Sequence, residues 1–311
     1  MLPLSVLDLS FVTSGSPPSA ALHRTIDLAR HVDRLGFTRF WLAEHHNLSS
    51  VASPAPEIMI GQIAAATSLL RVGSGGIMLP NHAPLMVAER FRMLEALFPG
   101  RIDLGLGRAP GTDGMTAMAL RRHQETPRNQ LGGDEFLERL QELILWDRGG
   151  FPPGHPFARI VAMPSDVRLP PLFLLGSSGY SGRLAAQIGS GFAFAHHFAS
   201  HDAADPMLAY RDGFTPSESR DRPLAILAVS VICADTNAEA ERLASSQDLS
   251  GLRRARGEYG PIPSPAEAAA ISYDAAEREL IRRNRERLFV GAPAASRSGS
   301  VPSPAPRRPT N

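Results

Sequence analysis

The amino-acid sequence predicts a parallel α/β fold, most simply a single (β/α)₈ barrel. Short apolar runs suited to buried strands alternate with longer segments of helical spacing, and seven such strands occur along the chain. No break in composition divides residues 1–291. Because 311 residues also suit one barrel of typical size, we expect residues 1–291 to form one domain.

The first hundred residues alternate regularly between the two patterns. Residues 20–35 carry apolar side chains at helical spacing and are followed by Gly36, a residue typical of helix ends. The sequence Phe98-Pro99-Gly100 ends a later helix. The predicted strands in this part span residues 4–9, 38–43, 71–79 and 101–106, and the predicted helices span residues 20–35, 55–69 and 84–97.

The rest of the chain is less regular. We expect residues 107–128 to form a long loop near the site with some helix, and residues 133–146 to form an amphipathic helix. Six prolines predict an irregular path for residues 152–171. Ser264-Pro265-Ala266-Glu267 has the form of a capping box and predicts a short helix. The other predicted elements are strands at residues 172–175, 191–195 and 224–234 and a helix at residues 273–288.

The composition excludes several classes of function. All 32 basic residues are arginine, so neither a Schiff-base lysine nor a Walker-type phosphate lysine is available. The formal net charge of +1 gives no footprint for nucleic acid. No apolar run reaches the roughly 18 to 20 residues of a membrane helix, and the first nine residues lack the basic region of a signal peptide, so we expect a cytoplasmic protein. The single cysteine, Cys233, lies in an apolar run and is expected to be buried.

A carboxylate and two imidazoles follow the strand predicted at residues 38–43. Glu44, His45 and His46 come directly after it, and polar groups at the carboxyl ends of barrel strands face the ligand site. Histidines after a strand also often do no more than bond loop carbonyls. The pattern alone therefore leaves a catalytic and a structural interpretation open.

A metal centre is an alternative use of the histidines, because His82, His196 and His197 also lie near predicted strand ends. However, neighbouring residues in an extended chain point to opposite sides, so His45 and His46 cannot easily share a metal ion. The spacings HxH and HExxH are absent from the sequence. We therefore expect no metal.

Two glycine-rich segments invite other interpretations. The run GLGRAPG at residues 105–111 has the wrong spacing for a dinucleotide-binding turn. The run GSSGYSG at residues 176–182 does not match a nucleophile elbow, but free amides at a helix start suit a phosphate. Arg108, at the end of a predicted strand, could supply the positive charge.

Three motifs together carry a resemblance to a known family. The sequences FWLAEHH, VGSGGIMLPNHAPLMVAERF and RIDLGLGRAPG occur in this order. They resemble the bacterial luciferase-like flavin-dependent monooxygenases, in particular the single-chain luciferase-family oxidoreductases, over residues 4–291. The resemblance implies a luciferase-like (β/α)₈ TIM barrel that binds reduced FMN at the carboxyl ends of its strands.

The resemblance also implies roles for individual residues. His45 matches the catalytic histidine, a general acid or base around a flavin hydroperoxide, with Glu44 and His46 in support. Gly75-Gly76 falls where relatives have a non-proline cis peptide under the flavin ring. The residues that match or fall on the phosphate site are Arg108, Ser177, Ser178 and Tyr180, and the residues expected on the substrate side are His82, His196 and His197.

The implied activity is a two-component monooxygenase. A separate flavin reductase supplies reduced FMN, dioxygen is the co-substrate and a small organic molecule is oxidised; a homodimer is expected, with neither nucleic acid nor membrane as a partner. The sequence marks neither the substrate nor light emission. The alternatives are a deazaflavin-dependent dehydrogenase on the same barrel and a non-catalytic flavin-binding protein.

The end of the chain departs from the family pattern. Relatives continue after the segment FVGAP with an acidic helix, an eighth strand and a last helix, whereas this chain continues with ASRSGSVPSPAPRRPTN. We therefore expect a barrel that is open between its first and seventh strands, with the last strand and helix missing or replaced by a disordered tail at residues 292–311. A frameshift, a truncation or a divergent tail would each explain this composition.

Overall fold

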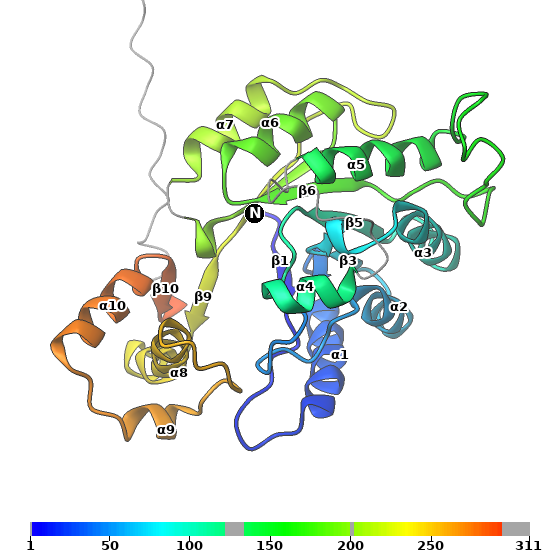
Figure 1. Ribbon diagram of the computed structural model, residues 1–311. Coiled ribbons are helices and arrows are strands. Elements are labelled where there is room, and N and C mark those ends of the chain that lie inside the picture. The colour runs from blue at the N-terminus through cyan, green and yellow to red at the C-terminus, as the bar shows by residue number, and fades with distance from the viewer. Residues whose placement is uncertain (1, 122–133, 200–201, 294–311) are drawn as a thin grey trace, which may run out of the picture. The chain divides into compact units, whose positions relative to one another are not determined.

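A computed structural model describes residues 2–121, 134–199 and 202–293 (Figure 1). These residues fall into two compact units. The first unit contains residues 1–228 together with residues 259–261, and the second contains residues 229–258 together with residues from 262 onward. Part of the expected loop at residues 107–128 and nearly all of the expected tail at residues 292–311 lie outside the described residues.

The first unit is a parallel α/β barrel. Its strands are β1 (Ser5–Asp8), β2 (Arg39–Leu42), β3 (Arg71–Ser74), β4 (Ile77–Met78), β5 (Ile102–Gly107), β6 (Leu172–Gly176), β7 (Gly191–Ala195) and β8 (Ala225–Ala228). They run in the order β1-β2-β3-β5-β6-β7-β8, β4 also pairs with β5, and every pair is parallel. Among the described residues β1 and β8 each pair with a single strand, so the barrel is nearly closed but has a gap between them. The fold class predicted from the sequence, with its opening, is confirmed.

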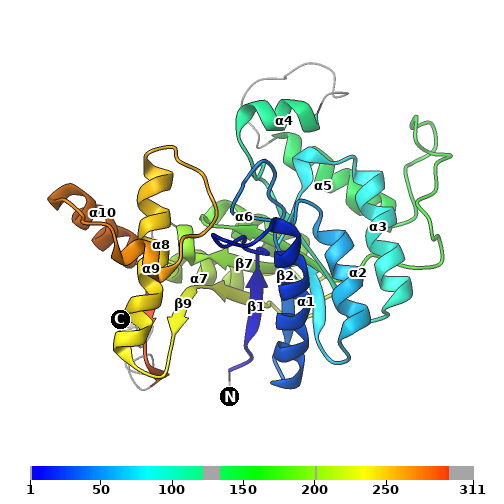
Figure 2. The same cartoon turned by 90° about the horizontal axis from the view of Figure 1, so that it is seen from below.

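Helices connect the strands and cover the outside of the barrel (Figure 2). A proline stands at the start of each of the first three long helices, where its missing N–H costs no helical hydrogen bond. Residues 84–97 form a helix with the predicted bounds. The helices of this unit are α1 (Pro18–Arg34), α2 (Pro56–Ala66), α3 (Pro84–Leu97), α4 (Gly114–Leu120), α5 (Asp134–Asp147), α6 (Gly179–Ile188) and α7 (Ala204–Asp212), with short 3₁₀ helices η1 (Leu79–Asn81) and η2 (His196–Phe198).

The core lies between the strands and these helices. All residues of β5 and β7 are buried, as continuous apolar strands covered on both faces require. β3 and β5 approach closely because a glycine of one strand lies against the backbone of the other. A Cβ added at Gly105 of β5 would lie 2.1 Å from the carbonyl oxygen of Ser74 in β3. The Ser74 hydroxyl donates to the Gly105 carbonyl and accepts from its amide, which locks the two strands together.

The second unit holds a two-stranded parallel sheet, β9 (Ser230–Cys233) and β10 (Leu288–Gly291), with helices α8 (Asn237–Ala255), α9 (Pro265–Ala269) and α10 (Ala275–Arg285). The predicted capping box at Ser264 and Glu267 is present. The single strand expected at residues 224–234 is instead divided at Val229 into β8 and β9. The expectation of a buried Cys233 is wrong: the thiol is free and exposed, because alternate residues of β9 face outward.

The excursion between α5 and β6 is irregular, as its prolines predicted, and contains a cis peptide at Met163-Pro164. None of the helices in the described part of the chain is long and apolar enough to cross a membrane.

Candidate active site

The Glu44 carboxylate is the centre of a hydrogen-bond network at the carboxyl end of β2. It is fully buried. One oxygen, Oε1, accepts from His46 Nε2 at 2.8 Å and from Asn81 Nδ2 at 3.2 Å. The other, Oε2, accepts from the Met78 amide at 2.8 Å and from His82 Nε2 at 2.9 Å. All four lone-pair directions of the carboxylate are therefore used by protein groups.

These contacts decide the charge of Glu44. Burial acts to raise the pKa of this carboxyl, but the hydrogen bond and charge of His82 and the bonds from Met78 and His46 outweigh it, so the pKa lies below its ordinary value. Glu44 is thus an anion that holds the two histidine rings in place rather than a group free to exchange protons.

His45 differs from its two neighbours. Its Nδ1 atom is shielded from solvent and has no hydrogen-bond partner. Burial lowers the pKa of the ring, an effect that Glu44 opposes and His46 reinforces, so the imidazole is neutral near pH 7. A neutral imidazole can hold a proton on one nitrogen and accept one on the other.

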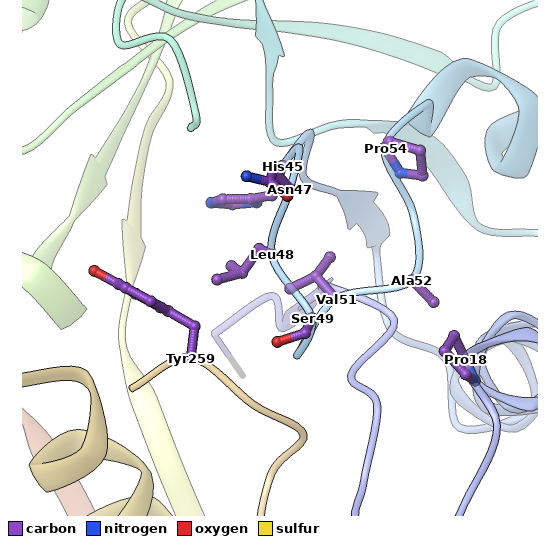
Figure 3. Close-up of a pocket in the computed structure, with 9 residues that line it drawn as sticks. All are labelled: Pro18, His45, Asn47, Leu48, Ser49, Val51, Ala52, Pro54 and Tyr259. Atoms are coloured by element: carbon purple, nitrogen blue, oxygen red, sulfur yellow. The ribbon is translucent and has the colours of Figure 1, made fainter. Parts of the chain in front are cut away.

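A pocket of about 610 Å³ lies beside the His45 ring. Figure 3 shows His45 and Asn47 close together, with Leu48 between them and the ring of Tyr259, a residue of the first unit. None of the described residues that line it carries a formal charge near pH 7, given the neutral His45. The lining is formed by Pro18, His45, Asn47, Leu48, Ser49, Val51, Ala52, Pro54 and Tyr259.

Gly75 and Gly76 lie against the residues that carry the network. The peptide bond between them is cis, as the resemblance implied. The Glu44 amide donates to the Gly76 carbonyl at 3.3 Å, which places this peptide beside the end of β2. A Cβ at Gly76 would lie 2.7 Å from the Gly105 carbonyl oxygen, so only glycine fits without moving β5.

The residues predicted for a phosphate meet at the carboxyl ends of β5 and β6. The Arg108 guanidinium lies over the Tyr180 ring, with its Cζ atom 4.7 Å from the ring centroid. Ser177 and Ser178 precede α6, and the Ser178 side chain does not cap the helix. The first amides of α6 therefore have no side-chain cap, and a guanidinium stands near them.

The three histidines predicted on the substrate side have different positions. His82 is bound to Glu44. His196 and His197 form the start of η2, where His197 Nδ1 lies 3.3 Å from the Ala228 carbonyl oxygen and His196 Nδ1 is buried without a partner. None of the three lines the pocket beside His45.

Sequence reasoning missed several residues of this region. Asn81 donates to Glu44 and to the Pro110 carbonyl, and its Oδ1 accepts from Arg121. Asn47 donates to Asp113 at 3.0 Å, which joins the loop after β2 to the start of α4. The motif that contains His82 also contains Asn81, so this residue could have been found. Among the described residues no group of three or more His, Cys, Asp or Glu is arranged to hold a metal ion.

Comparison with known proteins places these features in context. The family model described as luciferase-like monooxygenase matches residues 2–300. YvbT of Bacillus subtilis (strain 168) is 44% identical over 93% of this chain and 84% of its own length. A luciferase-like monooxygenase of Escherichia coli (strain K12) is 41% identical over 95% of this chain and 85% of its own.

Solved structures share the fold. The structure of apo-MsnO8 has a TM-score of 0.84 and 38% identity, covering 96% of this chain and 87% of that chain. The oxygenating constituent of 3,6-diketocamphane monooxygenase from Pseudomonas putida, solved in complex with FMN, has a TM-score of 0.65 and 20% identity, covering 95% of this chain and 86% of that chain. The second likeness, at this identity, is one of fold alone.

Proposed function

This chain belongs to the luciferase-like monooxygenase family, and we propose that it uses reduced FMN and dioxygen to oxidise a small, uncharged organic molecule. The observation that carries the proposal is the contrast within one tripeptide. Glu44 and His46 are bonded to each other, whereas His45 has a buried, unpaired nitrogen on a ring that lines a pocket.

Residues at the carboxyl ends of β3, β5 and β6, outside the lining of this pocket, fit FMN. The Gly75-Gly76 peptide lies beside the Glu44 network and carries no side chain, although the Cβ positions of both glycines face protein atoms. Arg108 and the uncapped start of α6 suit a phosphate, the one with a guanidinium and the other with backbone amides. When bound, reduced FMN would supply the electrons that activate dioxygen.

The chain's own contribution follows from the geometry. The His45 imidazole is neutral and can give or take a proton at a ring nitrogen that no protein group occupies. The Glu44 anion binds the His46 and His82 rings and so holds them in place. The pocket beside the ring has apolar and neutral polar walls, which suit a substrate without formal charge.

A separate flavin reductase as the source of reduced FMN is part of the proposal. The glycine-rich run at residues 105–111 lacks the spacing of a dinucleotide-binding turn. The space beside Gly105 and Gly107 is filled by Ser74 and Met78, so this run has no room for a nicotinamide dinucleotide. These two observations support a reductase on a separate chain.

Oxygen uptake tests the proposal. The purified protein is given chemically reduced FMN and matched pairs of uncharged and anionic organic compounds, and FMN binding is followed by quenching of protein fluorescence. We expect FMN binding and substrate-dependent oxygen uptake for members of the uncharged set. His45→Ala should lose the uptake and keep FMN binding, while His23→Ala, an exposed histidine of α1, should behave as wild type.

Three results would contradict the proposal. The first is absence of FMN binding, the second is binding of a deazaflavin in its place, and the third is full substrate-dependent oxygen uptake by His45→Ala. Uptake with the anionic compounds alone would refute the assignment of an uncharged substrate and leave the oxygenase assignment intact.

A further inference from the structure

A cluster of arginines lies at the amino ends of the barrel strands, away from the site described above. Arg39 is the first residue of β2 and Arg71 the first residue of β3, and the register of the two strands pairs them directly. Asp103, the second residue of β5, faces both guanidinium groups. Arg220, from the loop before β8, completes the cluster, since its guanidinium lies over the same Phe173 ring as that of Arg39.

Asp103 has no hydrogen-bonding capacity left for Arg220. Its Oδ1 accepts from Arg71 Nε at 2.9 Å and from a second nitrogen of the same guanidinium at 2.6 Å. Its Oδ2 accepts from Arg39 Nε at 3.0 Å and from the Trp41 indole N–H at 3.1 Å. A carboxylate offers about four acceptor directions, and these four donors fill them.

Two guanidinium groups therefore remain with unused donors. The Arg220 guanidinium has no hydrogen bond or ion pair with any described residue, and Arg39 uses only its Nε atom. Both lie against the Phe173 ring, with Cζ atoms 5.3 Å and 5.6 Å from its centroid. Both are only partly exposed; the side chain of Arg39 is 15% exposed.

The charges are also unbalanced. Three guanidinium groups face one carboxylate, which leaves two positive charges among partly buried groups. Burial lowers the pKa of Arg220, and the neighbouring Arg39 and Arg71 lower it further, although Tyr210 and Asp103 act in the opposite direction. Positive charges held together in partial burial are unfavourable unless an anion accompanies them.

We propose that Arg39 and Arg220 bind a small oxyanion, a carboxylate or a phosphate, at the amino end of the barrel. A planar guanidinium with free N–H groups matches the geometry of both anions, and two of them converging on one ring can bind the same ligand from two directions. Asp103 and Arg71 would serve as the support that orients Arg39. This site is independent of the proposed oxygenase activity.

Phosphate and succinate titrations test the site, with thermal unfolding as the readout and ionic strength held constant with chloride. A ligand that binds the folded state raises Tm in a saturable way. Because phosphate can also bind near Arg108, the titrations are repeated in Arg108→Gln. We expect a saturable rise in Tm with at least one anion in wild type and in Arg108→Gln.

Arg220→Gln is the decisive variant, because the Arg220 side chain makes no hydrogen bond or ion pair with a described residue and its loss gives up only the contact with the Phe173 ring. It should weaken the anion affinity at least tenfold, whereas Arg222→Gln, an exposed arginine two residues away, should leave it unchanged. A stronger response to succinate would identify a carboxylate ligand and a stronger response to phosphate a phosphate ligand. The proposal is overturned if neither anion gives a saturable shift, if Arg220→Gln responds as wild type, or if Arg108→Gln alone removes the response.

Discussion

Glu44→Gln is the most informative single change in this barrel, because it alters one charge and almost no volume. The replacement side chain has one carbonyl and one NH₂ group. The carbonyl must face the Met78 amide, which can only donate, so the NH₂ group faces the Asn81 amide nitrogen. Asn81 cannot turn around, because its nitrogen donates to Pro110 and its oxygen accepts from Arg121. Two donors then face each other in a buried place.

The stability cost of Glu44→Gln is the sum of the changes in four hydrogen bonds. The hydrogen bond from Asn81 is lost, and the bonds from His82 and Met78 change from a charged to a neutral acceptor. His46 faces the NH₂ group, as Asn81 does, so its ring must change tautomer and accept at Nε2 in a neutral bond. Each change from a charge-assisted to a neutral bond costs about 1 kcal/mol, and the lost bond adds about 1.5 kcal/mol. Relief of the buried charge offsets a part of this sum. We therefore expect the free energy of unfolding to fall by about 3 kcal/mol, which corresponds to a Tm about 6 to 12 °C lower.

Urea unfolding followed by tryptophan fluorescence measures this difference. Both tryptophans, Trp41 and Trp146, belong to the first unit, so the signal reports on the barrel. Glu57→Gln is the control: Glu57 makes one ion pair, with the partly exposed Arg90, and its loss should cost about 1 kcal/mol or less. If Glu44→Gln is destabilised no more than Glu57→Gln, the central place given to Glu44 is wrong.

Three further predictions follow from the same contacts. Arg108→Gln should weaken FMN binding about tenfold in a fluorescence titration, because it removes a guanidinium proposed to bind the phosphate. The control Arg148→Gln, at an exposed position, should bind FMN as wild type does. Equal affinities of Arg108→Gln and wild type would show that Arg108 does not bind the phosphate. Gly76→Ala should lower the free energy of unfolding by about 1 to 3 kcal/mol, because the added Cβ meets the Gly105 carbonyl. Gly114→Ala is the control in the same urea experiment, and since its Cβ has open space it should be neutral or stabilising. Since burial holds the pKa of His45 below its ordinary 6.5, the stability due to the neutral ring is complete above pH 6.5 and declines as the pH falls through the pKa of the folded state. His45→Gln should therefore lose less stability than wild type when the pH is lowered from about 7.5 to about 5, and an equal loss would contradict the lowered pKa.

Local signals predicted the elements that they control. The bounds of α3 and β7 were predicted correctly because a proline or a glycine stands at the start of each. The capping box at Ser264 and Glu267 could be recognised in a segment of four residues, because its hydrogen bonds join residues that are close in the chain. The same signal occurs at Thr236 and Glu239, where the Thr236 side chain accepts from the Glu239 amide at the start of α8, so this missed helix was predictable as well.

The features that sequence reasoning missed depend on contacts between distant segments. Cys233 lies in an apolar run, but β9 pairs with β10 and turns alternate side chains outward, which no local pattern reveals. The Glu44 network needs η1 to bring Asn81 and His82 to the end of β2, some 37 residues away in the chain. Tyr259 joins the pocket from a segment more than two hundred residues beyond His45.

Unmet hydrogen-bonding capacity separates supporting residues from reactive ones at both ends of the barrel. At the carboxyl end, the Glu44 carboxylate accepts from His46 and His82 and has no acceptor direction left, and the buried nitrogen without a partner in this tripeptide is Nδ1 of His45. At the amino end, Asp103 accepts from Arg71, Trp41 and the Nε atom of Arg39, which leaves Arg220 without a hydrogen bond or ion pair among the residues that the structure describes. Buried polar groups in folded proteins are almost always bonded, and we interpret the unpaired groups at these two places as positions where a ligand binds. The two ends differ in what is missing: a neutral ring nitrogen calls for a proton donor or acceptor, and a guanidinium calls for an anion.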